Sequence, residues 1–137
     1  FEDVCVLYRD GRMETFDMRE VDIDEIIEAD PWQVWSFGPT LLDENGEVRS
    51  RYDVPRAVSY PNPRSAIGYY EPGHYCLVVV DGREYDHSVG MGIEALAAIF
   101  EQLGCKVAYN LDGGNSSLLY IHFHIFRRKR AAKRYTI

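Results

Sequence analysis

The second half of the chain places an amphipathic helix between two apolar strands, and this order constrains the fold more than any other feature. Hydrophobic residues recur at helical spacing over residues 92–103, and Gly104 supplies a stop signal. The apolar run Cys76–Val80 precedes this helix, and the run Lys106–Leu111 follows it. Cys76–Val80 is apolar on both faces, which is typical of a central strand. We therefore predict an α+β fold, in which a mixed β-sheet carries one long amphipathic helix on one face.

Turn and cap signals predict short hairpins and a short helix in the first half. Two hairpins are expected, each with a glycine-containing turn between its strands: Val4–Arg9 with Arg12–Asp17, and Thr40–Leu42 with Glu47–Arg51. Asp22 is a candidate N-cap for a helix over Ile23–Ala29, which Pro31 ends. Gln33–Phe37 is predicted to be a strand, and the three prolines within residues 53–64 predict a connecting loop. Three more strands are expected later in the chain: Ser65–Tyr70, Tyr75–Val80 and Leu118–Phe126.

The three cysteines give little information about compartment or metal binding. Cys5, Cys76 and Cys105 form no Cys-x-x-Cys pair, which argues against a structural zinc site. An odd number of thiols is also poor support for a disulfide framework. Cys76 and Cys105 lie inside apolar runs, so we expect them to be small core residues.

Charge is distributed unevenly along the 137 residues, which carry a formal net charge of −7. Residues 1–126 hold nine basic and 22 acidic groups, whereas the last eleven residues, 127–137, hold six basic groups and no acid. We expect one domain over 1–126 and a basic tail over 127–137. The acidic domain repels phosphate backbones over a Debye length of about 8–10 Å, so no nucleic acid partner is expected and an anionic ligand needs a local site. No run approaches the length of a membrane span, and a start without Met suggests a mature or excised piece.

The stretch Asn110–Ser117 is the strongest candidate for a functional site. It follows a predicted buried strand and combines a carboxylate, Asp112, with two glycines and short polar side chains. The adjacent glycines Gly113 and Gly114 let the backbone approach a ligand closely and direct N–H groups at an anion. A plain hairpin turn is the alternative, although a turn does not require the hydroxyls that follow the glycines.

Two other segments are candidate anion sites. Arg64 follows a rigid proline at the entrance to a strand, where a guanidinium can hold phosphate or carboxylate with two parallel hydrogen bonds. The alternative is a solvated loop arginine paired with an acid. Asp81 and Arg83 flank a glycine after an apolar run, a pattern that a plain turn also explains. Residues 88–92 precede the helix and can offer N–H groups to an anion, but no Gly-Lys-Ser/Thr follows to support nucleotide binding.

The histidines do not form a convincing metal site. His74 and His87 flank strand ends, where solvation explains them as well as sugar binding does. His122 and His124 share one face of a predicted strand, a spacing that can bind a metal but is also usual on a half-exposed strand. We therefore predict no cofactor and no metal-ligating residues, while a requirement for a divalent metal is left open.

Five segments resemble, in the same order, those of the phosphodiester glycosidase family: Trp35–Leu41, Asn62–Gly68, Leu77–Arg83, Ser88–Met91 and Asn110–Ser117. The resemblance covers about residues 33–120. It implies a phosphodiester glycosidase-like domain over 1–126 and hydrolysis of the bond between a sugar's anomeric carbon and a phosphodiester. A substrate such as N-acetylglucosamine-1-phosphodiester, a role in exopolysaccharide or cell-envelope glycan metabolism, a bacterial source and an extracytoplasmic location are further expectations.

The resemblance also implies roles for residues at the matching positions. Asp112 is expected to act as the nucleophile or as the base that activates water. Arg64 is expected to hold the phosphate, assisted by the amides of Gly113–Gly114 and by Ser116. Asn110 is expected to orient the carboxylate or to bind a sugar hydroxyl.

A phosphate leaving group changes what the site must supply. A phosphomonoester has a second pKa of about 6. As a leaving group it therefore needs less proton donation than an alkoxide does. One carboxylate with strong phosphate-binding groups can then lower most of the barrier. Asp81 is the nearest candidate for a second acid, and Ser65, Arg83 and Ser117 are expected to contact substrate.

Two departures from the family pattern leave a second function open. An upstream Asn-Gly-x-Phe-Phe-like segment is not found, and the sequence after Ser117 does not match, which indicates an incomplete catalytic domain. The alternative is a non-catalytic module that binds sugar-phosphate polymers of the cell envelope. A third hypothesis gives the function to Arg127–Arg134, whose clustered cations can contact anionic lipid or nucleic acid.

Overall fold

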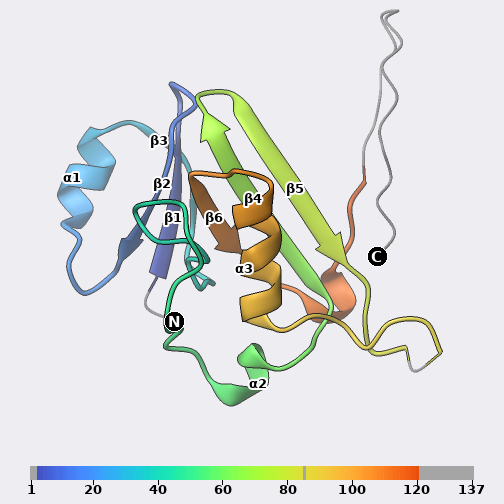
Figure 1. Ribbon diagram of the computed structural model, residues 1–137. Helices are drawn as coiled ribbons and strands as arrows, with labels where there is room; N and C mark the ends of the chain where they lie inside the picture. The colour runs from blue at the N-terminus through green and yellow to red at the C-terminus, as the bar shows by residue number, and fades with distance from the viewer. Residues whose placement is uncertain (1–2, 85, 121–137) are drawn as a thin grey trace, which may run out of the picture.

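Two three-stranded antiparallel sheets form the fold of residues 3–84 and 86–120, which are the residues that the computed structural model describes (Figure 1). The first sheet has the order β2 (Met13–Asp17), β1 (Asp3–Tyr8), β3 (Pro31–Trp35). The second has the order β5 (His74–Val80), β4 (Arg64–Glu71), β6 (Val107–Asn110). The α+β class is confirmed. The single mixed sheet is corrected to two sheets in which each described pairing is antiparallel.

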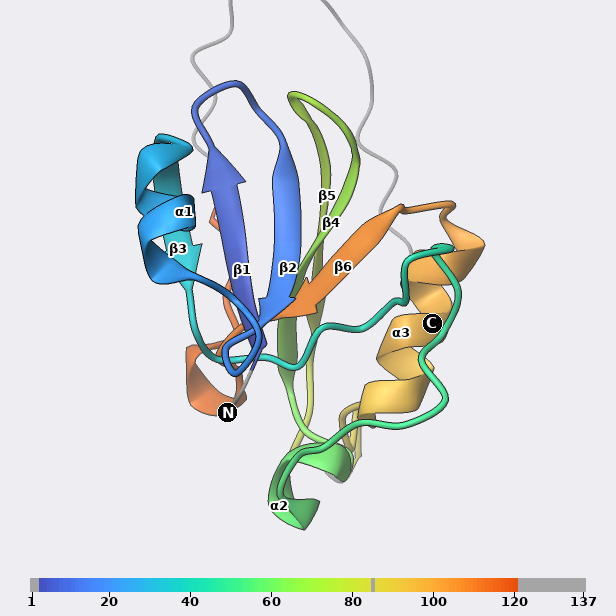
Figure 2. The same cartoon turned by 90° about the vertical axis from the view of Figure 1, so that its left-hand side faces the viewer.

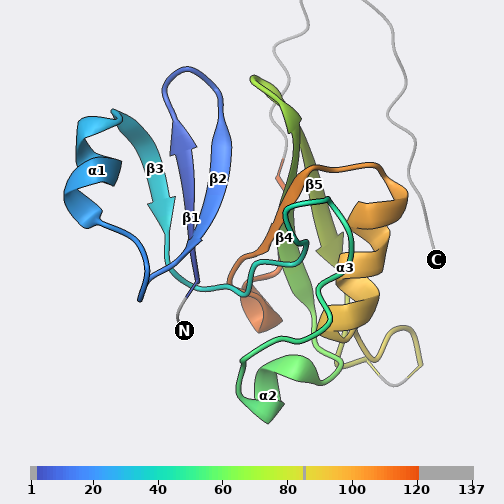
Figure 3. The ribbon, with the colours of Figure 1, turned by 60° about the vertical axis from the view of Figure 1, so that its left-hand side comes forward.

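The first sheet follows the local signals of the sequence. β1 and β2 pair across the Asp10-Gly11 turn, as predicted, and β3 pairs with the other edge of β1. The carboxylate of Asp22 accepts a hydrogen bond of 2.9 Å from the amide of Asp24, which caps α1 (Ile23–Glu28). In Figure 3 this sheet and α1 lie on one side of the molecule.

The second sheet reverses one prediction, because β4 and not Cys76–Val80 is the central strand. Only alternate residues of β5 contact the core beneath the helix, and Leu77 between them is 55% exposed. β4 instead carries the small residues Ala66 and Gly68, which let a helix pack closely over the middle of the sheet. Small size at the helix contact, and not apolar density, determines which strand is central.

The amphipathic helix is confirmed as α3 (Ile93–Gln102), which lies against the second sheet on its outer side (Figures 1 and 3). Four residues of the periodic stripe are buried, Ile93, Leu96, Ala97 and Phe100, whereas the fifth, Leu103, follows the helix and is 44% exposed. The helix has ten residues, which is an ordinary length, so the prediction of a long helix is not supported. Gly104, at φ +75°, follows its end.

A core between the two sheets joins them into one body. Met13 from the first sheet packs with Ile67 and Tyr109 from the second. The turns of the two main hairpins also touch, because the Tyr75 hydroxyl donates a hydrogen bond of 2.6 Å to the carbonyl of Gly11. Figure 2 shows β1, β2, β4 and β5 running beside one another, with β6 running from the end of α3 toward the first sheet.

The connecting segments differ from the prediction in three places. The expected loop over 53–64 contains a one-turn helix, α2 (Arg56–Ser59), that begins after Pro55. The second predicted hairpin forms its turn but pairs only through a bridge between Leu42 and Val48. Residues 118–120 are not a strand, and the rest of that predicted strand, with both of its histidines, lies outside the described residues, as does the basic tail.

The cysteine and membrane predictions have clear outcomes within the described part of the chain. Cys105 is buried and Cys76 is half-buried, both in the core beneath α3, and Cys5 is buried between the sheets. All three are free thiols. No described helix has the length and apolar character that crossing a bilayer demands.

Candidate active site

The Asn110–Ser117 loop leaves the end of β6 and is attached to the beginning of β4. The amide of Leu111 donates to the carbonyl of Ser65 at 2.8 Å, and the amide of Gly114 donates to the carbonyl of Pro63 at 3.1 Å. The chain then forms a short 3-10 turn, η1 (Gly114–Ser116). Asp112 stands at the start of this turn with an exposed side chain. The first residues of β4 thus determine the position of the predicted catalytic carboxylate.

The two glycines of the loop are required for different reasons, Gly113 by the close approach of a neighbouring group and Gly114 by its backbone conformation. A Cβ at Gly113 would lie 2.6 Å from the carbonyl oxygen of Pro63, nearer than real Cβ atoms come to such an atom. Gly114 has φ +73°, a left-handed conformation that favours glycine. The guanidinium of Arg83 lies against Gly114, with Nη1 3.4 Å from a Cβ built there. The Asp-Gly-Gly sequence is therefore a packed junction.

The amides of these glycines already have partners. The Gly113 amide donates to Oδ1 of Asp112 at 2.7 Å, and the Gly114 amide is bonded to the Pro63 carbonyl. The predicted contact of both amides with a phosphate therefore requires an exchange of these hydrogen bonds. In the observed arrangement, the Gly113 amide holds the carboxylate of Asp112 in place.

Arg64 is buried, with 4% of its surface exposed. Its Nε donates to the carbonyl of Met91 at 2.8 Å, and its Nη2 donates to the carbonyls of Val58 at 2.6 Å and Tyr60 at 2.7 Å. Burial lowers the pKa of Arg64, because desolvation disfavours the charged form. These carbonyls occupy the edge of the guanidinium that a phosphate clamp would use, so Arg64 holds together the segments around the site.

Arg83 is the exposed arginine beside the double-glycine turn. Its backbone has φ +63°, and its Nη2 donates to Oδ1 of Asn62 at 3.0 Å. The Asn62 amide group in turn donates to the carbonyls of Ala57 and Tyr60 at 2.9 and 3.0 Å. This chain of hydrogen bonds fixes the position of the Arg83 guanidinium while leaving it open to solvent.

Three of the family-like segments meet at Asn62. A Cβ on Gly90 would lie 2.4 Å from the carbonyl carbon of Asn62, and one on Gly82 would lie 2.7 Å from the Cα of Gly90. Asn62 and Met91 also form an isolated bridge. Because only glycine fits at these contacts, the segments 62–64, 81–83 and 88–91 form one close-packed base for the site.

The polar residues of this base contact mainly one another. The carboxylate of Asp81 is exposed, and its Oδ2 lies 3.8 Å from Nε2 of His87. The Ser88 hydroxyl donates to the Asp81 carbonyl at 2.6 Å.

In the neighbouring loop, the Ser116 hydroxyl donates to the Gly113 carbonyl at 2.8 Å. Oγ of Ser117 is buried and has no hydrogen-bond partner among the described residues.

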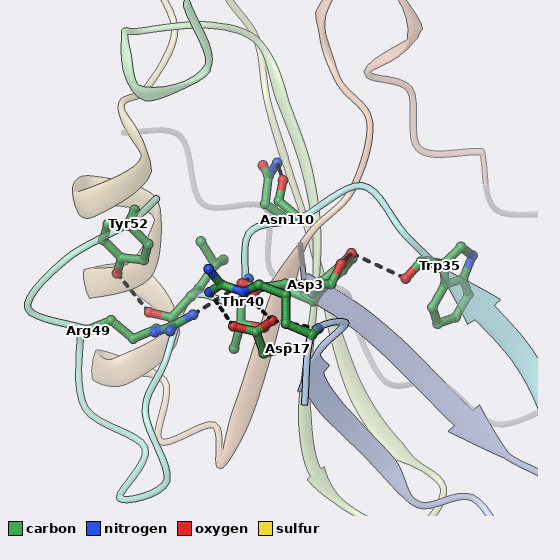
Figure 4. A network of polar contacts seen from close by, with 11 residues as sticks. Asp3, Asp17, Trp35, Thr40, Arg49, Tyr52 and Asn110 are labelled. Atoms are coloured by element: carbon green, nitrogen blue, oxygen red, sulfur yellow. Dashed lines mark hydrogen bonds and ion pairs between the residues drawn. The ribbon is translucent and has the colours of Figure 1, made fainter. Parts of the chain in front are cut away.

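Asn110 lies inside the core and holds another family-like segment. Its side chain is fully buried, and its Nδ2 donates to the carbonyl of Gly38 at 2.7 Å (Figure 4). Its Oδ1 has no partner within the described chain. The contact places Asn110 against the Trp35–Leu41 segment. The observed partners of Asn110 are thus backbone carbonyls of that segment, Gly38 for its side chain and Pro39 for its amide.

A polar network that the sequence did not reveal surrounds the same segment (Figure 4). Oδ2 of Asp3 accepts hydrogen bonds from the Thr40 amide at 2.7 Å and from Nη1 of Arg49 at 3.1 Å. The Tyr109 hydroxyl donates to the Asp3 carbonyl at 2.8 Å. The network borders a hollow of about 50 Å³ whose lining includes Phe37. These residues are far apart in sequence, so no local pattern could have predicted the network.

Within residues 3–84 and 86–120, no three or more His, Cys, Asp or Glu side chains are grouped so that they could hold a metal ion. The structure does bring several of the predicted site residues together. Ser65, Arg64, Arg83 and the Gly113–Gly114 turn are arranged around Pro63.

Comparisons with known proteins identify the family of the chain. The family model described as phosphodiester glycosidase matches residues 2–136. The SPbeta prophage-derived uncharacterized protein YomE of Bacillus subtilis (strain 168) is 31% identical over 115 residues, which are 84% of this chain and 18% of YomE.

Two solved structures share the fold. The catalytic domain of zebrafish N-acetylglucosamine-1-phosphodiester alpha-N-acetylglucosaminidase, auto-inhibited by its pro-peptide, has a TM-score of 0.63 at 24% identity, over 85% of this chain and 41% of that one. A hypothetical protein from Synechocystis has a TM-score of 0.55 at 19% identity, over 85% and 29%. The chain thus spans less than half the length of these relatives. Since the family model matches nearly every residue, the chain belongs to the phosphodiester glycosidase family.

Proposed function

We propose that this chain forms the phosphate-binding part of an enzyme that hydrolyses sugar-1-phosphodiesters, such as N-acetylglucosamine-1-phosphodiester. One observation carries the proposal: the exposed carboxylate of Asp112 is followed directly by two glycines, and the second of them, Gly114, packs against the exposed guanidinium of Arg83. A carboxylate beside a cation that is held in place suits cleavage of a sugar–phosphate bond. Membership of the family supports the hydrolase class.

Arg83 is the proposed phosphate-binding cation, and Arg64 is proposed as a positioning residue. Arg83 is exposed and held by Asn62, so little side-chain freedom is lost when it binds an anion. Arg64 is held by three backbone carbonyls and keeps the 62–64 segment in place beneath Arg83. Arg64 was expected to hold the phosphate, and this role is now proposed for Arg83. Arg83 was already expected to contact the substrate.

Asp112 is proposed to attack the anomeric carbon or to activate a water that does so. In either case the bond from C1 to the phosphate oxygen breaks, and its electron pair leaves with the phosphate group. Arg83 stabilises the negative charge that develops on this leaving group. Because the leaving phosphate needs little protonation, a single carboxylate is sufficient, and Asp81 is the proposed donor where a proton is required.

The proposed setting is exopolysaccharide or cell-envelope glycan metabolism outside the cytoplasm. An acidic domain that acts on an anionic polymer must bind it through a local positive group. The exposed Arg83 supplies that group.

The function is tested on the full-length protein that contains this chain, with a synthetic N-acetylglucosamine-1-phosphodiester as substrate. We expect release of free sugar, and an Arg83→Gln variant is expected to lower kcat/KM by about 10–100-fold, because a charged hydrogen bond contributes about 1.5–3 kcal/mol. Arg9→Gln is the matched control, since Arg9 is an exposed arginine of the first hairpin that pairs with Asp30. Binding of the substrate analogue without any released sugar would instead support the non-catalytic module.

A further inference from the structure

A hollow of about 500 Å³ lies where the segment that precedes α2 passes the first turn of α3. Figures 2 and 3 show this segment running alongside α3. The lining consists of Ser50, Arg51 and Tyr52 from the segment, Ser59 from α2, and residues 92–95 from the beginning of α3. The volume lies within the range of about 300–1,000 Å³ that is usual for small-molecule sites. The hollow is therefore a candidate binding site that the proposed reaction does not use.

The walls of the hollow are held in place. The Tyr52 hydroxyl donates a hydrogen bond of 2.7 Å to the carbonyl of Leu41, which fixes the position of the aromatic ring. A Cβ built on Gly92 would lie 3.3 Å from the carbonyl oxygen of Ser59, so the wall from α2 and the wall from α3 touch there. Arg64 joins the same two walls, because the three carbonyls that it binds belong to residues 58, 60 and 91. A ligand would therefore meet a preformed surface, which lowers the entropy cost of binding.

The polar groups of the lining suit an uncharged ligand that both donates and accepts hydrogen bonds. The guanidinium of Arg51 offers only donors, and the carboxylate of Glu94 offers only acceptors. Both side chains are exposed, and neither takes part in an ion pair within residues 3–84 and 86–120. The Ser59 hydroxyl donates to the carbonyl of Arg56 at 2.9 Å, which leaves its oxygen available as an acceptor.

The charges of the lining do not select an anion. Glu94 already supplies the negative charge that the beginning of a helix favours, and it offsets the positive charge of Arg51. The hydroxyl groups of a sugar can bind both side chains, and the apolar face of a sugar ring can pack against the ring of Tyr52. A sugar without charge is therefore the class of ligand that the hollow fits.

The hollow and the candidate active site are neighbours at one end of the second sheet. Because β4 runs antiparallel to β5 and β6, the beginning of β4 and the ends of the other two strands lie together. Gly90 packs against Asn62 in the base of the candidate site, and Gly92, two residues later, lines the hollow.

We propose that the hollow binds an uncharged sugar unit of the glycan substrate, separate from the sugar whose bond to phosphate is cleaved. Arg51 donates to sugar oxygens, Glu94 accepts from sugar hydroxyls, and Tyr52 packs against the ring. That this sugar belongs to the substrate rests on the proposed function, whereas its binding in the hollow does not. The enzyme would then act on glycans of more than one sugar unit in preference to a single sugar phosphate.

The test follows the backbone amide signals of the isotopically labelled full chain by NMR during a titration with N-acetylglucosamine. We expect the signals of residues 50–52 and 92–95 to shift. Arg51→Gln and Glu94→Gln are each expected to weaken binding at these residues by about tenfold or more, because each removes a hydrogen bond to a charged group. Arg9→Gln, an exposed arginine of the first hairpin, should leave the binding unchanged.

A parallel titration with inorganic phosphate distinguishes the classes of ligand. Three results would overturn the proposal: no shift at the hollow with the sugar, sugar-induced shifts confined to residues 83 and 112–114, or shifts at the hollow with phosphate but not with the sugar. Sugar binding at the hollow of a full-length protein that hydrolyses no sugar-1-phosphodiester would support the hollow as a sugar site and contradict the proposed enzymatic function alone.

Discussion

Two arginines near the beginning of β4 carry the same charge in opposite surroundings. Arg64 is surrounded by backbone carbonyls and almost inaccessible, whereas Arg83 is exposed beside Gly114. Both stand next to family-like motifs, so the sequence cannot tell which of them meets the ligand. The difference arises from carbonyls of residues 58, 60 and 91, whose position depends on the folded chain.

The different surroundings predict different effects on stability. Arg64→Lys leaves acceptors of a buried hydrogen-bond network unpaired, and we expect it to lower the free energy of unfolding by about 2–4 kcal/mol. Arg83→Lys replaces an exposed side chain and is expected to change the free energy of unfolding by about 0.5 kcal/mol or less. Urea denaturation followed by circular dichroism measures both variants. Equal losses in the two would contradict the positioning role of Arg64.

At the scale of elements, the position of β4 depends on its small residues beneath α3. The helix stripe, the first hairpin and the capped α1 were predictable, because each rests on residues close together in sequence. The central strand was not, because the apolar density of Cys76–Val80 conceals that Gly68 is the residue that admits Phe100. Contacts between elements, and not local periodicity, decide strand order.

Replacement of Gly68 tests this packing. In Gly68→Ala, the added Cβ would lie 2.6 Å from Cδ1 of Phe100, and we expect a loss of about 1–3 kcal/mol in the free energy of unfolding. Gly73→Ala is the control, because Gly73 has φ +79° but no atom within 4 Å of its built Cβ, so only the backbone cost of about 1 kcal/mol applies. A smaller loss for Gly68→Ala than for Gly73→Ala would show that α3 does not require the glycine.

At the scale of the whole molecule, the two sheets are joined by buried side chains and by hydrogen bonds that cross between them. The Tyr109 hydroxyl, on β6, donates to the carbonyl of Asp3 in the first sheet and also contacts the carbonyl of Trp35. Burial raises the pKa of Tyr109, so the hydroxyl stays protonated and available as a donor. Nothing local in the sequence links these residues, which explains why a single sheet was predicted.

Removal of that hydroxyl measures the connection between the sheets. Tyr109→Phe removes the donor from two part-buried carbonyls, and we expect thermal and urea unfolding to show a loss of about 1–3 kcal/mol. Tyr60→Phe is the control, since Tyr60 is 49% exposed. A Tyr109→Phe protein as stable as the wild type would mean that apolar packing alone holds the sheets together.

The candidate site combines what was predictable with what was not. The carboxylate and glycines of the 110–117 loop were identified from their residue types and their place after a strand. The hydrogen bonds that occupy the Gly113 and Gly114 amides, and the chain from Asn62 to Arg83, depend on segments that meet only in three dimensions.

The most direct test of the proposed function is the rate of sugar release by Asp112→Asn in the full-length protein. The substitution keeps the size of the side chain and removes its charge, and we expect kcat/KM to fall by about 1,000-fold or more, while binding of a substrate analogue persists. Asp24→Asn, an exposed carboxylate of α1, is expected to leave the rate unchanged. Near-normal hydrolysis by Asp112→Asn would contradict the assignment of the reacting carboxylate.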